Sequence, residues 1–183
     1  MAISTRLSQA FGAIVVFRFP ELVQVEMQVA RLDLSFPYIP GLLSFREIPV
    51  LAKCLSLVKT SFQVLVCDGQ GIAHPRGFGL ASHLGVLLRR PTIGCAKSRL
   101  VGEHEPVAPG RGEFSRLIYQ GRQVGSVLRT REAVRPVYVS PGHLMNHASA
   151  RRIVLACTTR YRLPEPTRAA DALAGEEKRR YGA

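Results

Sequence analysis

The chain has 183 residues, of which 46% are hydrophobic and 21% charged, a composition that excludes an intrinsically disordered protein and is sufficient for a hydrophobic core. Twenty-five Lys and Arg against 13 Asp and Glu give a formal net charge of +12. So large a positive surplus favours a polyanionic partner, with nucleic acid ahead of an anionic membrane surface. We expect a single domain over residues 1–183, with a frayed tail from about residue 175.

The four cysteines are far apart and form no C-x-x-C pair, so neither a zinc site nor a disulfide framework is expected. Reduced thiols are the rule in the cytoplasm, where we expect the protein to reside. No apolar run approaches the roughly 18 residues of a membrane helix, and the apolar block near the start has no small-residue cleavage site after it. The sequence therefore predicts neither a membrane span nor a signal peptide.

The first third of the chain predicts a hairpin followed by a helix. Residues 10–19 are mostly apolar, and residues 22–32 alternate apolar and polar side chains, which is typical of two antiparallel strands. Two prolines and a glycine in residues 35–47 (SFPYIPGLLSFRE) indicate a loop. Helical spacing then predicts a helix over residues 48–59, with Pro49 in its first turn.

The remaining elements alternate between the two types of secondary structure. The periodicity predicts strands over 62–67, 92–96, 123–130 and 137–140, and helices over 78–88, 146–157 and 168–178. A proline- and glycine-rich loop covers residues 102–112. A hairpin followed by alternating helices and strands indicates an α/β fold with a mixed sheet.

Two charged residues come directly after short apolar strands. Asp68 follows the strand ending at Cys67, and Lys97 follows the strand TIGCA. Ligands of open α/β sheets gather at the carboxyl ends of strands, where a carboxylate can bind Mg²⁺ and a lysine can hold a phosphate. The alternatives are an Asp-Gly turn without chemistry and a solvated lysine.

Other candidate residues have equally simple structural explanations. Glu47 and Asp171 suit the first turn of a helix because of the helix dipole. His74, next to Pro75-Arg76, is a candidate for phosphate binding or acid–base chemistry. Tyr38 lies between prolines, in a stiff loop suited to stacking on bases, although a tyrosine that covers the core is the alternative. Together these residues suggest a metal-dependent nuclease.

Five segments in order closely resemble the endonuclease V family. They are FPYIPGLLSFRE, VLVCDGQGIAHPRGFGLASHLG, RPTIGCAKSRL, VYVSPGH and YRLPEPTRAAD, and the match runs from about residue 10 to about residue 174. The resemblance implies a ribonuclease-H-like α/β fold, with a mixed β-sheet flanked by helices. It also implies a DNA repair endonuclease that cuts the second phosphodiester 3′ to deoxyinosine and leaves 3′-hydroxyl and 5′-phosphate ends. The implied cofactor is Mg²⁺, with Mn²⁺ as the alternative.

The resemblance also assigns roles to residues in the matching segments. It implies that Asp68 and Glu47 bind the metal, that His74 and Lys97 lie near the scissile phosphate, and that Asp171 is a late carboxylate of the site. The residues that it places on DNA are Tyr38, as a wedge in the space of the displaced base, with Gly41, Gly69, Gly71, Arg76, Gly94 and Arg162. Glycine at such positions permits a close approach of backbone and nucleic acid.

The sequence departs from the family at its first motif. That motif is a strand ending in a metal-binding aspartate, and residues 1–10 contain no acidic residue. We expect the first strand to be truncated, either because the start is assigned too late or because the protein is an impaired form. The first explanation is favoured, since every other motif is intact.

The expected partner is DNA that contains deoxyinosine, bound by a monomer without membrane contact. Two alternatives remain for the function. One is a protein that binds inosine-containing DNA without cutting it, because the first aspartate is missing. The other is a ribonuclease directed at inosine in RNA.

Overall fold

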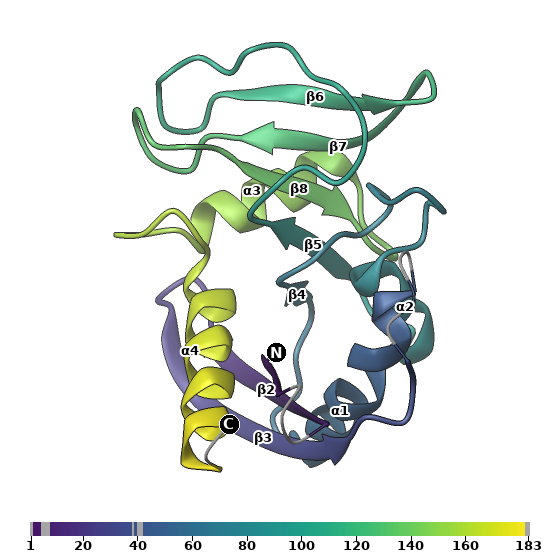
Figure 1. The fold of residues 1–183 in the computed structure, drawn as a ribbon. Coiled ribbons are helices and arrows are strands. Elements are labelled where there is room, and N and C mark those ends of the chain that lie inside the picture. Colours follow the sequence, from purple (N-terminus) through teal and green to yellow (C-terminus); the bar gives the residue numbers. More distant parts are fainter. Residues whose placement is uncertain (1, 5–7, 38, 40–41, 182–183) are drawn as a thin grey trace. The chain divides into compact units, whose positions relative to one another are not determined.

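A computed structural model of the chain describes residues 2–4, 8–37, 39 and 42–181. The chain divides into two compact units. The first comprises residues 1–62 and 166–183, and the second comprises residues 63–165. In Figure 1 the first unit carries the purple and blue elements with the yellow C-terminal helix, and the second carries the teal and green elements.

The first unit contains a three-stranded antiparallel sheet in the order β1-β2-β3. Its strands are β1 (Ala2–Ser4), β2 (Gln9–Arg18) and β3 (Val23–Asp33). The predicted hairpin is thus confirmed. The helix α1 (Leu43–Leu57) packs on β2 and β3, and Gly12 of β2 lets the helix approach closely, since a Cβ there would lie 3.0 Å from the Cys54 sulfur.

Helix α1 begins five residues earlier than predicted, because the prolines before it suggested a longer loop. Pro49 therefore lies inside the helix, and the prediction that it lies in the first turn was wrong. A proline there removes one backbone hydrogen bond, and burial of Val50, Leu51 and Cys54 against the sheet offsets that loss. Glu47 lies within α1, not at its junction with a loop.

The C-terminal helix α4 (Glu165–Arg180) is longer at both ends than predicted. Pro166 fits its first turn, because a proline there loses no helical hydrogen bond. Three basic residues in the last turn suit the negative end of the helix dipole. Beyond them the ring of Tyr181 contacts Phe11 and Arg31, and the fraying of the tail from residue 175 stays a prediction.

The second unit contains a five-stranded mixed sheet in the order β4-β5-β8-β7-β6. Its strands are β4 (Leu65–Cys67), β5 (Thr92–Ala96), β6 (Phe114–Tyr119), β7 (Arg122–Leu128) and β8 (Val137–Pro141). Only β4 and β5 are parallel. The α/β class with a mixed sheet and flanking helices is confirmed.

Two helices accompany this sheet (Figure 1). Helix α2 (Leu80–Leu88) packs on β4 and β5, and α3 (His147–Ala156) packs on β7 and β8. Asn146 caps α3, because its side chain accepts a hydrogen bond from the Ser149 amide at 2.8 Å. The core between α3 and the sheet includes Ile93, Val139 and Val154, all at most 1% exposed.

Strand β6 was not predicted. It pairs with β7 through a tight turn at Gln120 and Gly121, which both have positive φ angles of 50° and 73°. Such angles characterise the type I′ turn of two-residue hairpins, so the Gln-Gly pair before β7 was the missed signal. Within the part of the chain that the structure describes, no helix has the length and hydropathy to cross a membrane.

Candidate active site

Asp68 and Lys97 come together at one edge of the five-stranded sheet. Their strands are parallel neighbours, with Cys67 opposite Gly94, so both carboxyl ends lie at the same edge. The Lys97 ammonium lies 2.9 Å from the Asp68 carboxylate. The two side chains are 42% and 28% exposed, so the ion pair remains open to a ligand from solvent.

Arg162 joins this pair from the segment after α3. Its guanidinium donates a hydrogen bond to the Lys97 carbonyl at 3.4 Å. Beneath them lies Cys95, where burial and then the Asp68 charge raise the pKa of the thiol to about 12. Cys95 is therefore a neutral core residue and not a nucleophile. The sheet edge thus presents one carboxylate and two cations.

Gly71 and Gly94 lie against backbone of the chain itself. A Cβ at Gly94 would stand 2.3 Å from the Gly71 nitrogen, and one at Gly71 would stand 2.0 Å from the Pro141 carbonyl oxygen. This packing alone accounts for glycine at both positions. Gly69 differs, since a Cβ there would meet only the Leu80 side chain at 3.4 Å, an ordinary contact.

Ser140 supports the loop that follows Asp68, and the sequence did not single it out. Its buried hydroxyl accepts a hydrogen bond from the Gly71 amide at 2.8 Å. Gln70 also holds the loop, because its side chain donates to the Ser98 carbonyl at 3.2 Å. A polar residue that ends a buried strand, as in VYVSP, was the available signal for Ser140.

His74 and Arg76 belong to one turn of this loop. The His74 Nδ1 atom accepts a hydrogen bond from the Arg76 amide at 3.2 Å. Burial and then the Arg76 charge lower the pKa of His74, which favours a neutral imidazole near pH 7. Nδ1 is occupied as an acceptor, so Nε2 carries the ring proton in the neutral form. The Arg76 side chain is exposed.

The remaining predicted site residues belong to the first unit or fall outside the description. Glu47 is half-buried on α1, and Asp171 is exposed on α4. Tyr38 and Gly41 lie outside the described residues. The segment that contains them is flanked by Phe36 and Phe45, whose rings stack with centroids 5.6 Å apart.

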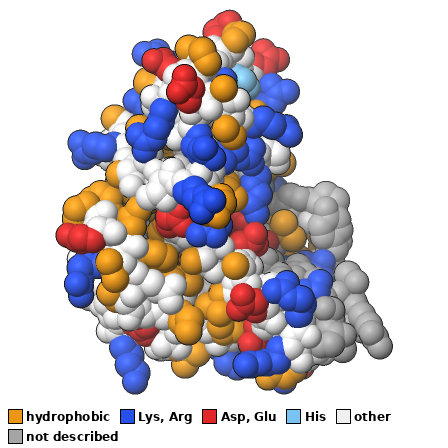
Figure 2. Space-filling model, turned by 90° about the vertical axis from the view of Figure 1, so that its left-hand side faces the viewer, with side chains coloured by type: hydrophobic (Ala, Val, Ile, Leu, Met, Phe, Trp, Pro, Cys, Tyr) orange, Lys and Arg blue, Asp and Glu red, His pale blue; other side chains and the backbone are white. Residues whose placement is uncertain are grey.

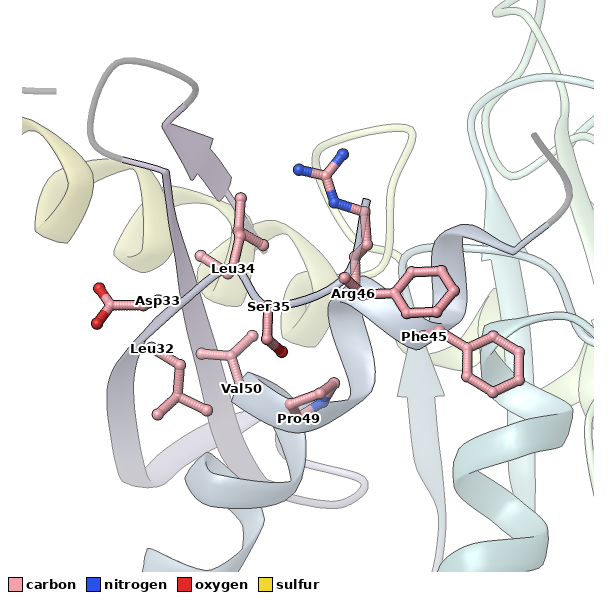
Figure 3. A pocket seen from close by; sticks show the side chains of 10 residues that line it. Leu32, Asp33, Leu34, Ser35, Phe45, Arg46, Pro49 and Val50 are labelled. Carbon is pink, nitrogen blue, oxygen red and sulfur yellow. The ribbon is translucent and has the colours of Figure 1, made fainter. Parts of the chain in front are cut away.

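A small pocket lies in the first unit between the end of β3 and the start of α1 (Figure 3). Its lining includes Leu32, Pro49 and Val50, with Asp33 and Arg46 at its edge. Figure 3 shows the Asp33 carboxylate and the Arg46 guanidinium extending in different directions, without meeting. The pocket therefore does not combine its two charged groups into one binding site.

Residues that suit a metal ion are present, although the described residues include no group of three His, Cys, Asp or Glu placed to hold one. Asp68 provides oxygen donors at an open sheet edge, the ligand type that Mg²⁺ prefers. Mg²⁺ is commonly held by one or two carboxylates together with substrate phosphates and waters. Asp68 therefore fits such an ion as one protein ligand.

A family model for endonuclease V matches residues 1–172. The chain belongs to the endonuclease V family. An endonuclease V from Roseiflexus sp. strain RS-1 is 56% identical over 165 residues, which cover 90% of this chain and 74% of the relative. One from Nostoc sp. strain PCC 7120 is 55% identical over 163 residues, which cover 89% of this chain and 74% of the relative.

Solved endonuclease V structures share the fold. The Streptomyces avermitilis protein has a TM-score of 0.96 at 42% identity, covering all of this chain and 80% of that one. A Ciona intestinalis endonuclease V, solved with a 24mer DNA containing an inosine followed by a ribo-adenosine, has a TM-score of 0.84 at 30% identity, covering 98% of this chain and 84% of that one. The chain is thus a nuclease-type hydrolase of a metal-dependent family.

Proposed function

We propose that this protein recognises deoxyinosine in DNA and hydrolyses the second phosphodiester on its 3′ side with the help of Mg²⁺. The observation that carries the proposal is the Asp68–Lys97 pair at the carboxyl ends of two parallel strands, in a chain of the endonuclease V family. A carboxylate and an ammonium side by side suit a site that binds both a metal ion and a phosphate.

In this proposal Asp68 is a metal ligand, and Glu47 and Asp171 are the further carboxylates of the site. A divalent ion held there would supply a hydroxide nucleophile at neutral pH and would neutralise charge on the leaving oxygen. Lys97 and Arg162 draw the scissile phosphate to the sheet edge and stabilise the negative charge that grows on it. The neutral His74 donates a hydrogen bond to a phosphate oxygen from Nε2.

Recognition of the lesion follows from the chemistry of the base. Hypoxanthine presents a carbonyl acceptor and a ring N–H donor where adenine presents the reverse pattern, and an inosine pair is weaker, so less energy is needed to flip the base out. We assign Tyr38 as the aromatic wedge that fills the vacated space, with Gly41, Gly69, Gly71, Arg76 and Gly94 along the strand. The DNA complex of the Ciona relative, 30% identical to this chain, supports inosine as the target.

Inosine-containing RNA is a second candidate substrate. The nucleotide after the inosine in the Ciona complex is a ribo-adenosine, which places a 2′-hydroxyl beside the lesion in that relative. A comparison of nicking on three otherwise identical strands separates the two candidates. The strands are all DNA, all RNA, and DNA with a single ribonucleotide 3′ to inosine.

The decisive test is strand nicking of an inosine-containing duplex against its adenine counterpart over a range of Mg²⁺ concentrations. We expect nicking only with inosine, and a loss of about 100-fold or more in Asp68→Asn, because the amide removes the charged metal ligand. Circular dichroism and thermal melting control for folding. Selective binding without any nicking by the unmodified protein would instead show a binding protein, and full activity of Asp68→Asn would remove Asp68 from the site.

A further inference from the structure

Three neighbouring elements of the second unit carry cations and no acids. Strands β6 and β7 and helix α3, with six, seven and ten residues, contain no Asp or Glu. They contain four arginines and one histidine, which are Arg116, Arg122, Arg151, Arg152 and His147. Figure 2 shows many Lys and Arg side chains over the part of the molecule that holds these elements.

Arg151 of α3 lies across the face of the sheet at β6 and β7. Its guanidinium carbon stands 3.8 Å from the centre of the Phe114 ring, and its Nη1 atom donates to the Ser126 hydroxyl at 3.1 Å. A guanidinium stacked on an aromatic ring and tied by one hydrogen bond is held in a fixed orientation. Its remaining N–H groups stay available to a ligand.

Arg116 places a second cation beside Arg151. It is opposite Ser126 in the β6–β7 ladder, and directly opposed residues point to the same face of a sheet. Burial lowers the pKa of Arg151 most, and the positive charge of Arg116 lowers it further. Folding thus holds two like charges together, and an anion would relieve their repulsion.

Neither arginine has a carboxylate partner among the residues that the structure describes. Glu113 lies just before β6, and Glu103 pairs through its backbone with Ile118 of β6. Phe114 is 44% exposed, so an apolar surface adjoins the cations. Two guanidinium groups without a carboxylate partner, beside a partly exposed ring, match a phosphate with its sugar and base.

We propose that Phe114, Arg116 and Arg151 form a second nucleic-acid contact, which binds phosphates of the substrate away from the cut. The inference rests on the proposed function, since it needs a nucleic-acid substrate. Strand β6 lies three strands from β5 in the sheet order, or about 14 Å at 4.7–4.9 Å per strand. That distance corresponds to about four base pairs of duplex at 3.4 Å each, so the contact is separate from the scissile phosphate.

The salt dependence of binding to a long duplex without inosine tests this contact. The logarithm of affinity falls with the logarithm of salt concentration by about 0.9 for each phosphate neutralised. We expect the slope of Arg116→Gln/Arg151→Gln to be shallower than that of the unmodified protein by about 1.8, and that of Arg116→Gln alone by about 0.9. Arg116→Gln leaves the Arg151–Ser126 bond in place, so it still tests the contact if the double variant does not fold.

Arg18→Gln/Lys53→Gln is the matched control, because it removes two exposed charges from the first unit. We expect its slope to equal that of the unmodified protein. Equal slopes in Arg116→Gln and this control would overturn the proposed contact and leave the nuclease proposal intact. Duplex binding with the expected slopes but no nicking of inosine would overturn the nuclease proposal alone.

Discussion

Single side chains fix the loops around the sheet edge. Arg129 donates to three backbone carbonyls, at Val107, Ala108 and Val134. It thus joins the loop between β5 and β6 to the loop between β7 and β8. Arg111 donates to the carbonyls of Leu155 and Thr158, both at 3.1 Å, where α3 ends. The Leu155 carbonyl also accepts from the Thr158 amide at 3.2 Å, so Arg111 adds a charged donor there and places a cation at the negative end of the helix dipole.

Arg111→Ala should therefore lower the free energy of unfolding by about 1–2 kcal/mol, because two charge-assisted hydrogen bonds are lost at an exposed position. Urea denaturation followed by circular dichroism measures the change. Arg131→Ala serves as the control, since Arg131 is exposed and makes no side-chain hydrogen bond within the described part of the chain. Equal stabilities of the two variants would show that the Arg111 bonds do not form in solution.

At the scale of elements, one carboxylate ties β3 to the segment after α1. Glu26 accepts hydrogen bonds from the amides of Lys59 and Thr60 and from the Gln28 side chain, and these bonds lower its pKa from 4.5 to about 2. The side chains of Gln28 and then Thr60 lower the pKa most, ahead of the two backbone amides. The ionised form thus holds the chain at the point where α1 ends.

A lowered pKa in the folded state stabilises the protein above the unfolded value of 4.5, and this contribution is lost as the pH falls from 4.5 towards 2. We expect Glu26→Gln to be less stable than the unmodified protein at pH 7 and to differ from it less at pH 3. Melting temperatures across this range measure the effect. Glu21→Gln, at an exposed turn position, is the control, and a difference that stays constant with pH would contradict the assignment.

Elements with strong local signals were predictable, and those decided by tertiary contacts were not. Strand β5 (Thr92–Ala96) matches its prediction, because a short β-rich apolar run lies between a proline and a lysine. The start of α1 was missed, since the proline signal outweighed a helical turn that is stabilised by packing. The strand-end rule placed Asp68 and Lys97 each after a strand, but their ion pair and the stack of Arg151 on Phe114 join distant parts of the chain and left no local signal.

At the scale of the whole molecule, all four cysteines are buried as free thiols. Burial raises the pKa of Cys54 to about 11 and that of Cys95 to about 12, and it also raises that of Cys157. Burial limits the access of a reagent to these thiols. The raised pKa values lower the fraction of thiolate, which is the form that reacts with disulfide reagents. A chromogenic disulfide reagent should therefore detect almost no reactive thiol in the native protein. In the denatured protein it should detect four. A fast-reacting thiol in the native state would contradict this burial.

The close backbone packing at Gly71 and Gly94 has a consequence for catalysis. Neither position has room for even a methyl group, so the backbone that follows Asp68 packs tightly against β5 and Pro141 in the folded protein. Substrate binding then does not have to order the backbone of this loop, whose conformational entropy is already lost in the folded protein. The uncharged backbone packing at these two glycines thus makes the loop after Asp68 rigid before substrate arrives.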